Sequence, residues 1–139
     1  MVANDSPKRT FLSLRGSPVR VFRVLLGAIM LSTGIGVLYA LSDRPAFLES
    51  FPGAAEPQVY GGLLLVAGAG LVALIALWTW RRWGLLLYGV VVVASLALDR
   101  MAKAPPAHEL TVCVAAVAVF SLAYLNRTRF ASSGRSTTH

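Results

Sequence analysis

Four long apolar stretches alternate along the chain with short segments that hold most of its charged residues. A helix needs about 20 predominantly apolar residues to cross a bilayer, because each residue rises 1.5 Å and the hydrocarbon core is about 30 Å thick. The pattern therefore predicts an all-α fold, a polytopic membrane four-helix bundle. The predicted spans cover about residues 20–41, 59–80, 83–102 and 106–125.

The second stretch, VYGGLLLVAGAGLVALIALWTW from Val59 to Trp80, is uninterrupted and gives the strongest prediction of a span. The apolar parts of the third and fourth stretches are shorter than a comfortable span. We therefore expect the third helix to continue through Asp99 and Arg100. The fourth should begin near Pro106, because proline suits the first helical turn, where its missing N–H removes no hydrogen bond.

Composition supports a lipid-embedded protein. The 139 residues are 56% hydrophobic and 14% charged, with a mean hydropathy of +0.67, a balance more apolar than that of ordinary soluble domains. The formal net charge of +7 does not indicate a nucleic-acid partner, because the basic residues lie between and outside the apolar stretches and do not line one folded face. Membrane lipids are the expected surroundings.

The distribution of charge predicts the topology, since positively charged loops stay on the cytoplasmic side of a membrane. Residues 1–19 and 126–139 are predicted to be basic cytoplasmic tails, so both termini are cytoplasmic in the inner membrane of a cell. Every acidic residue except Asp5 lies on the opposite side, partly in the outer loop 42–58. The basic residues of the predicted cytoplasmic segments are Lys8, Arg9, Arg15, Arg20, Arg23, Arg81, Arg82, Arg127, Arg129 and Arg135.

The outer loop contains a short amphipathic segment. Phe47, Leu48 and Phe51 can share one face of a short helix, opposite Glu49 and Ser50. Such a helix is expected to lie flat on the outer membrane surface with its apolar face in the interface. The alternative is that the segment caps a cavity between the helices.

The first span could instead be a signal peptide that is removed from the mature protein. Its basic region is long, the pattern of small residues after Tyr39 is a poor cleavage site, and further spans follow. We therefore expect the first span to be retained. Cleavage would leave three spans and an amino terminus outside.

Small residues predict where helices pack, because helix association in lipid relies on close approach of the backbones. Ala28, Ser32, Gly36 and Ala40 recur at every fourth position of the first span. A neighbouring helix is expected to dock on this stripe. The single cysteine, Cys113, can form neither a disulfide nor a thiolate metal cluster within one chain, and we expect it to be a small buried apolar residue.

Five polar side chains fall at one predicted depth near the outer surface, and they come from three different helices: Glu56, Tyr60, Asp99, Arg100 and Glu109. Each has a simple structural role available, at a helix end or in an aromatic belt. Ionisable residues inside a span cost about 2.5 to 3.5 kcal/mol at its centre and indicate function by default. Together they predict an ion-paired polar cluster, with a buried Arg100 held by Glu56 or Glu109. It would act as a helix clasp or as the floor of a small pocket.

The chemistry of this region leaves several functions open. We favour a non-catalytic membrane protein that binds a partner or a small apolar ligand, the partner being another membrane protein or a further copy of the chain. The alternative is an intramembrane acid-base isomerase or hydratase acting on a lipid-like substrate, in which Glu109, Asp99 or His108 exchanges protons. A proton or ion pathway is disfavoured, because no ionisable residue lies at mid-membrane. No metal or cofactor is expected.

One part of the chain resembles a known family. The segment EPQVYGGLLLVAGAGLVAL, from Glu56 to Leu74, precedes the charged pair Asp99 and Arg100 and then Glu109. This arrangement resembles small bacterial four-span membrane proteins of a domain of unknown function in the DoxX-like neighbourhood. The resemblance covers about residues 20–125, and its most specific part is the acid followed by Tyr-Gly-Gly. It implies a four-helix inner-membrane bundle and no established activity or substrate.

Overall fold

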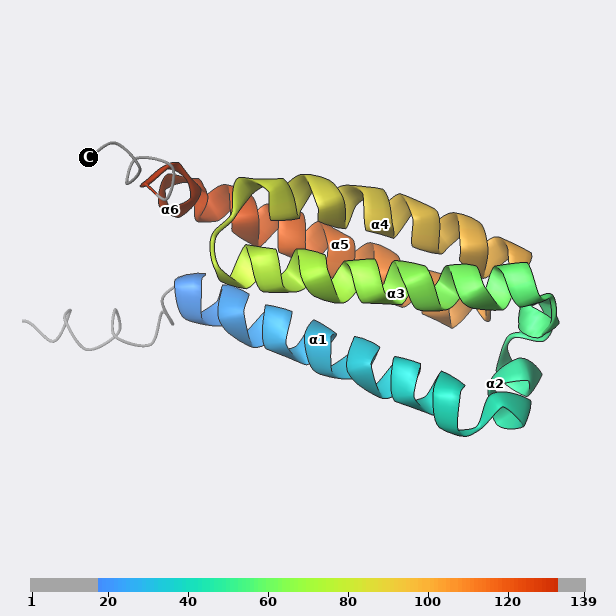
Figure 1. The fold of residues 1–139 in the computed structure, drawn as a ribbon. Coiled ribbons are helices and arrows are strands. Elements are labelled where there is room, and N and C mark those ends of the chain that lie inside the picture. Colours follow the sequence, from blue (N-terminus) through green and yellow to red (C-terminus); the bar gives the residue numbers. More distant parts are fainter. Residues whose placement is uncertain (1–17, 133–139) are drawn as a thin grey trace, which may run out of the picture.

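The structure, a computed structural model, describes residues 18–132 of the chain (Figure 1). Every regular element in this part of the chain is helical. The elements are α1 (Pro18–Ser42), α2 (Arg44–Ser50), the 3-10 helix η2 (Pro52–Ala55), α3 (Pro57–Trp78), α4 (Arg82–Met101), α5 (Pro106–Leu125) and α6 (Arg127–Ser132).

Four of these helices, α1, α3, α4 and α5, have 20 to 25 residues and a mean hydropathy between 1.7 and 2.2. They are long and apolar enough to cross a membrane, which confirms the predicted all-α fold with four long apolar helices. They suggest a multi-pass membrane protein. Of the predicted tails, residues 1–17 and 133–139 lie outside the described residues.

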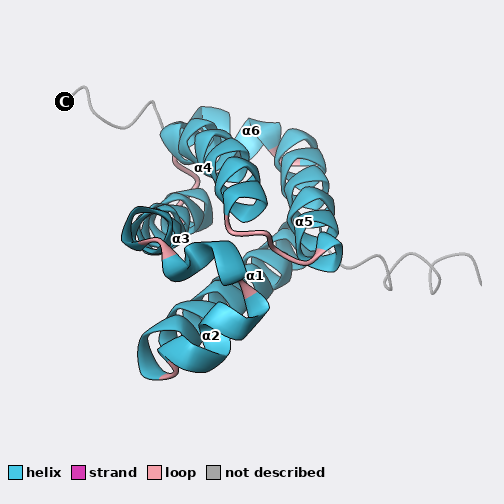
Figure 2. Cartoon of the chain, turned by 90° about the vertical axis from the view of Figure 1, so that its right-hand side faces the viewer, coloured by secondary structure: helices cyan, strands magenta, loops and turns pink. Residues whose placement is uncertain are grey.

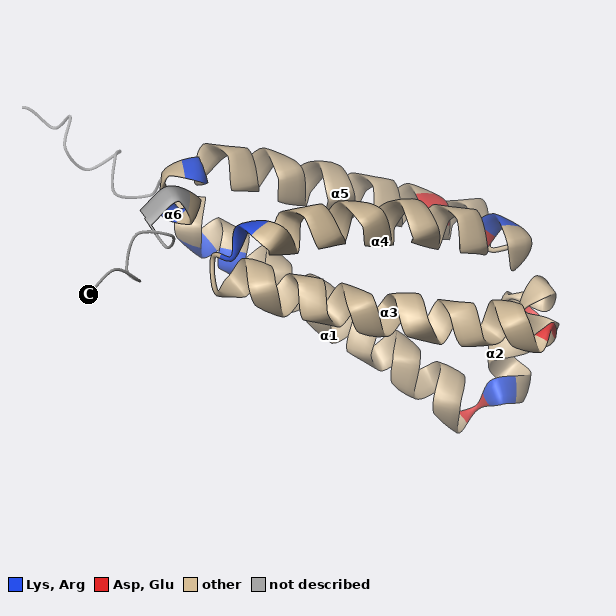
Figure 3. Cartoon of the chain, turned by 45° about the horizontal axis from the view of Figure 1, so that its top comes forward, with Lys and Arg blue, Asp and Glu red and all other residues tan. Residues whose placement is uncertain are grey.

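Successive long helices run in opposite directions, so the bundle has two distinct ends (Figure 1). We call the "basic end" the one formed by the start of α1, the α3–α4 turn and α6. The "loop end" is formed by α2, η2 and the α4–α5 turn. All acidic residues of the described part lie at or near the loop end, while arginines gather at the basic end (Figure 3).

The most extensive contact between helices joins α3 and α4, where glycines let the two backbones approach. A Cβ built on Gly84 would lie 2.7 Å from Ala76 Cβ and 3.0 Å from the backbone nitrogen of Leu77. Further along the same interface, a Cβ built on Gly70 would lie 3.3 Å from Val91 Cγ1. Close backbone packing of this kind is how helices associate in lipid, where no hydrophobic drive exists between them.

The turn between α3 and α4 has a defined geometry that sets this hairpin. Trp80 adopts a left-handed backbone conformation with φ of 59°. Its N–H donates to Leu77 O at 3.0 Å, and the N–H of Arg81 donates to Ala76 O at 2.8 Å. These two bonds form a Schellman motif, which satisfies carbonyls at the end of a helix. Lys103, with φ of 54°, occupies the same position after α4.

Aromatic side chains hold the basic end together. Phe22, Trp80 and Phe130 form a trio whose ring centroids lie 5.1 to 6.4 Å apart. The Nε of Arg82 also donates to Phe130 O at 2.9 Å. The sequence predicted a basic tail from residue 126 onward. In the structure α6 instead packs against the bundle, because Phe130 is buried against Phe22 and Trp80.

At the loop end, α2 and η2 cover the ends of the helices (Figure 2). Phe47 is buried, stacks on Phe51 with centroids 4.8 Å apart and meets Tyr60 edge-on at 5.9 Å. We expected Phe47 to face the membrane interface. Its ring points instead into a second small core with Ala40 and Val59. The segment therefore caps the bundle, because its apolar face packs against the ends of α1 and α3.

The prediction for the small-residue stripe of α1 is wrong within the described part of the chain. Ala28, Ser32 and Gly36 are exposed, and a Cβ on Gly36 would meet nothing within 4 Å. Only Ala40 is buried, against the outer loop. The α1 helix packs through other residues, such as Phe22 and Leu26. Cys113, expected to be buried, is also exposed, on α5.

The α3–α4 approach yields a first prediction. We expect Gly84→Ala to destabilise the bundle by about 1 to 3 kcal/mol, because overpacking a close contact forces backbones apart. Thermal unfolding in detergent micelles, followed by circular dichroism, measures this loss. The matched control is Gly68→Ala on α3, where an added Cβ meets nothing within 4 Å and unfolding should be unchanged or slightly delayed. Equal melting of the two variants would contradict the interface.

A second prediction concerns the docking of the loop. The N–H of Gly53 donates to Ala102 O at 3.0 Å, and a Cβ on Gly53 would overlap Met101 O. We expect Gly53→Ala to release η2 and α2, so that hydrogen exchange across residues 44–55 accelerates while the four long helices keep their protection. Gly61→Ala is the control, since space is open there. Unchanged exchange in Gly53→Ala would show that the loop is not held this way.

Candidate functional site

The α4–α5 turn gathers polar side chains at the loop end. Asp99 and Arg100 occupy the last turn of α4, and His108 and Glu109 occupy the first turn of α5. Pro106 at the first helical position starts α5 immediately after the turn, because proline fits there without a lost hydrogen bond. The sequence between the helices is short, so these side chains are brought face to face.

Asp99 is the most deeply buried charged residue of the described chain, with 2% of its surface exposed. Its Oδ2 atom has no hydrogen-bond partner there. The nearest charged group is His108, whose Nε2 lies 3.6 Å from Oδ2. That distance is too long for a good hydrogen bond, but it places a protonated imidazole close enough for an ion pair. Asp99 and His108 therefore connect α4 to α5.

Arg100 and Glu109 form a second link between the same helices, with Arg100 Nε 4.0 Å from Glu109 Oε2. The sequence predicted a buried Arg100, and this is wrong, since 79% of its side chain is exposed. Neighbouring residues point about 100° apart around a helix, so burial of Asp99 turns Arg100 outward. An exposed pair of this kind contributes little, about 0 to 1 kcal/mol.

His108 also contacts the covering loop. Its ring meets Phe51 edge-on, with centroids 5.5 Å apart. Phe51 in turn stacks on Phe47, so one line of rings runs from the loop to the imidazole. The sequence pattern singled out His108 only as a proton-exchanging group. Its position nine residues after Asp99, across a turn with two prolines, was the signal for pairing.

Two members of the predicted polar cluster lie elsewhere. The hydroxyl of Tyr60 donates to Ala40 O at 2.7 Å, and the guanidinium of Arg44 lies 5.0 Å from its ring centroid. Tyr60 therefore ties the start of α3 to the end of α1. Glu56 is exposed at the start of α3 and makes no side-chain cap. The single cluster of five is wrong, because no hydrogen bond or ion pair within residues 18–132 joins Glu56 or Tyr60 to Asp99, Arg100 or Glu109.

We call the four residues Asp99, Arg100, His108 and Glu109 the "α4–α5 clasp". Two grooves on the surface of the described residues are lined by residues outside the clasp. One, of about 450 Å³, lies at the loop end. Its lining residues are Pro52, Gly53, Ala55, Glu56, Val59, Met101 and Lys103. The other, of about 430 Å³, lies at the basic end. A substrate in either groove would not touch Asp99, His108 or Glu109.

Within residues 18–132, no three His, Cys, Asp or Glu side chains come together in a way that could hold a metal ion. Asp99, His108 and Glu109 are adjacent, but the Asp99 carboxylate is enclosed between helices. The arrangement is suited to joining two helices.

Comparison with known proteins adds no relative. No family model, no curated protein and no solved structure matches this chain. The resemblance of residues 20–125 to the DoxX-like neighbourhood therefore stays a prediction.

Proposed function

We propose that this chain is a small multi-pass protein of the bacterial inner membrane with both termini in the cytoplasm. It binds a membrane-protein partner, a second copy or a small apolar ligand, and performs no catalysis of its own. The α4–α5 clasp is proposed to fix the geometry of two helices. The α1 face and the grooves are the surfaces on which binding would take place.

The proposed orientation is supported by the separation of charge. Arginines of α1, the α3–α4 turn and α6 gather at the basic end (Figure 3), and cationic segments stay in the cytoplasm. Trp78 and Trp83 are partly exposed at the same end, where indole rings favour the level of the lipid headgroups.

The observation that carries the non-catalytic proposal is the geometry of the clasp. The carboxylate of Asp99 faces His108 between two helices, and neither groove reaches it. An enzyme acting on a lipid-like substrate would need an apolar cavity that leads to its proton-exchanging group. A clasp between α4 and α5 needs only the contacts of Asp99 with His108 and of Arg100 with Glu109.

The exposed face of α1 supports partner binding. Large apolar side chains, including Val24, Leu31 and Leu38, are 66 to 73% exposed. Ser32 and Gly36 lie among them and offer a place where another backbone could approach. In a bilayer this face is covered by lipid or by a helix of a partner.

The enzyme alternative retains one observation in its favour. Oδ2 of Asp99 is buried without a hydrogen bond and lies beside the imidazole of His108. Two such groups, with Glu109 near them, are the residue types that an acid-base isomerase or hydratase needs.

A double-mutant cycle separates the two functions. If the clasp is structural, Asp99→Asn and His108→Gln should be coupled in unfolding free energy by about 0.5 to 3 kcal/mol. Thermal unfolding in micelles of the unsubstituted protein, the two single variants and the double variant measures this coupling.

Glu49→Gln, at an exposed position of the same end, is the control and should leave unfolding unchanged. Zero coupling, with loss of bound lipid or partner in Asp99→Asn, would show that Asp99 belongs to a site and not to a clasp.

The orientation is tested by thiol labelling in intact cells. In a Cys113→Ala background, a cysteine at Ser50 of the loop end should react with a membrane-impermeant maleimide added outside. A cysteine at Thr79, beside the α3–α4 turn, should react only after the membrane is permeabilised. Both positions are exposed in the structure. Labelling of the Thr79 position from outside would reverse the proposed topology.

A further inference from the structure

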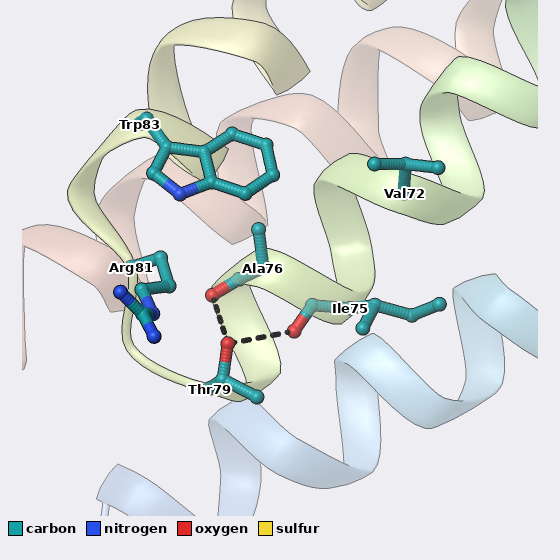
Figure 4. Close-up of a pocket in the computed structure, with 6 residues that line it drawn as sticks. All are labelled: Val72, Ile75, Ala76, Thr79, Arg81 and Trp83. Atoms are coloured by element: carbon teal, nitrogen blue, oxygen red, sulfur yellow. Dashed lines mark hydrogen bonds between the residues drawn. The ribbon is translucent and has the colours of Figure 1, made fainter.

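The groove at the basic end combines an apolar floor with a cationic rim. Val72, Ile75 and Ala76 line it from α3, and Trp83 lines it from the start of α4 (Figure 4). Arg81 lies beside Trp83, where the groove meets the end of the bundle. The apolar part extends back along α3 from Ala76 to Val72, just over one helical turn, about 6 Å. The floor therefore offers a path along the helix for a hydrocarbon chain.

Arg81 is the cation that the bundle leaves available at this groove. No carboxylate of residues 18–132 lies near it, since the acidic side chains are at the loop end (Figure 3). Two neighbouring arginines are engaged with the protein: Arg82 donates to Phe130 O, and the guanidinium of Arg23 lies 5.8 Å from the ring of Trp78. An anion would therefore meet an uncompensated guanidinium at the rim.

We propose that this groove binds an anionic phospholipid, with one acyl chain along Val72, Ile75 and Ala76 and the phosphate on Arg81. Basic pockets between membrane helices recognise lipid headgroups in this way. The guanidinium donates a bidentate pair of hydrogen bonds to phosphate oxygens.

Two further side chains suit the ester region of a lipid. Trp83 is half exposed and carries an indole N–H donor. Thr79 also lines the groove. Its Oγ1 donates to its own helix, at 3.0 Å from Ala76 O and 3.2 Å from Ile75 O, so its lone pairs remain as acceptors for a headgroup hydroxyl. The amino end of α4 carries the positive end of the helix dipole, which favours an anion. No acidic residue in the first turn of α4 offsets it.

The inference rests on the membrane placement proposed above and is independent of the clasp. It names a ligand for the basic end, whereas the clasp lies at the opposite end of the bundle. The groove would hold the lipid at the level where Trp78 and Trp83 meet the headgroups.

The test uses the full chain purified in detergent micelles and native mass spectrometry. Phosphatidylglycerol and phosphatidylcholine with identical acyl chains are added in turn, and the bound fraction of each is measured. We expect preferential retention of phosphatidylglycerol. Arg81→Gln should weaken it by about fivefold, the loss expected for one basic residue near a membrane surface.

Arg127→Gln is the matched control, because Arg127 lies at the same end over the ring of Tyr124 and outside the groove; it should change retention far less. Ile75→Trp fills the apolar floor and should lower binding of both lipids. Ile75 is 52% exposed, so the added ring has room, and Val72→Trp serves if that variant melts early. A large excess of inorganic phosphate should not displace the lipid, which separates a lipid from a free anion.

Equal retention of the two lipids, or equal losses in Arg81→Gln and Arg127→Gln, would overturn the inference. Displacement by inorganic phosphate would do so as well. These results leave the proposed membrane placement standing. A chain that carbonate washing removes from membranes would instead refute the placement itself.

Discussion

The close approach of α3 and α4 is the contact on which the rest of the bundle depends. Gly84 brings α4 against the backbone of α3 at Leu77, which is possible only without a side chain at that position. The Schellman turn through Trp80 follows from the same approach and points the indole at Phe22 and Phe130. Close packing between α3 and α4 therefore organises both the hairpin and the aromatic trio that holds α1 and α6. It also sets Trp83 beside Arg81, so the groove at the basic end is a product of this hairpin.

Polar contacts are confined to the ends of the helices, and this follows from the cost of polar groups in an apolar environment. Backbone groups within the long helices are satisfied by the helices themselves. The polar side chains that join different elements lie where the helices end: Tyr60 to Ala40 between α3 and α1, and Asp99 with His108 between α4 and α5. The two links between α4 and α5 differ in their energetic contributions. Asp99, which faces His108, is enclosed by protein, whereas Arg100, the partner of Glu109, is largely exposed.

The two ends carry different side chains. The basic end has arginines, indole rings and an apolar groove, and it is the end for which we propose contact with anionic lipid. The loop end carries the carboxylates and is covered by α2 and η2, and Phe47 of α2 is buried in a small core with Ala40 of α1 and Val59 of α3. The face of α1 between them has no partner within residues 18–132. The proposed lipid contact, helix clasp and partner contact would therefore occupy separate parts of one small molecule.

Hydropathy and length determined the number of helices, and their bounds agree with the predicted spans within about two residues, because crossing a membrane is a demand on each segment alone. Proline at residue 106 likewise marked the start of α5. Only the tertiary structure decided which faces turn inward. Ala28, Ser32 and Gly36 resemble an interface as much as Gly70 and Gly84 do, yet only the latter pack against a helix. Lipid and protein are both apolar environments for a helix face, so the pattern of residues along one segment cannot distinguish them. The pairing of Asp99 with His108, and its separation from Glu56 and Tyr60, depends on how whole helices are rotated against one another.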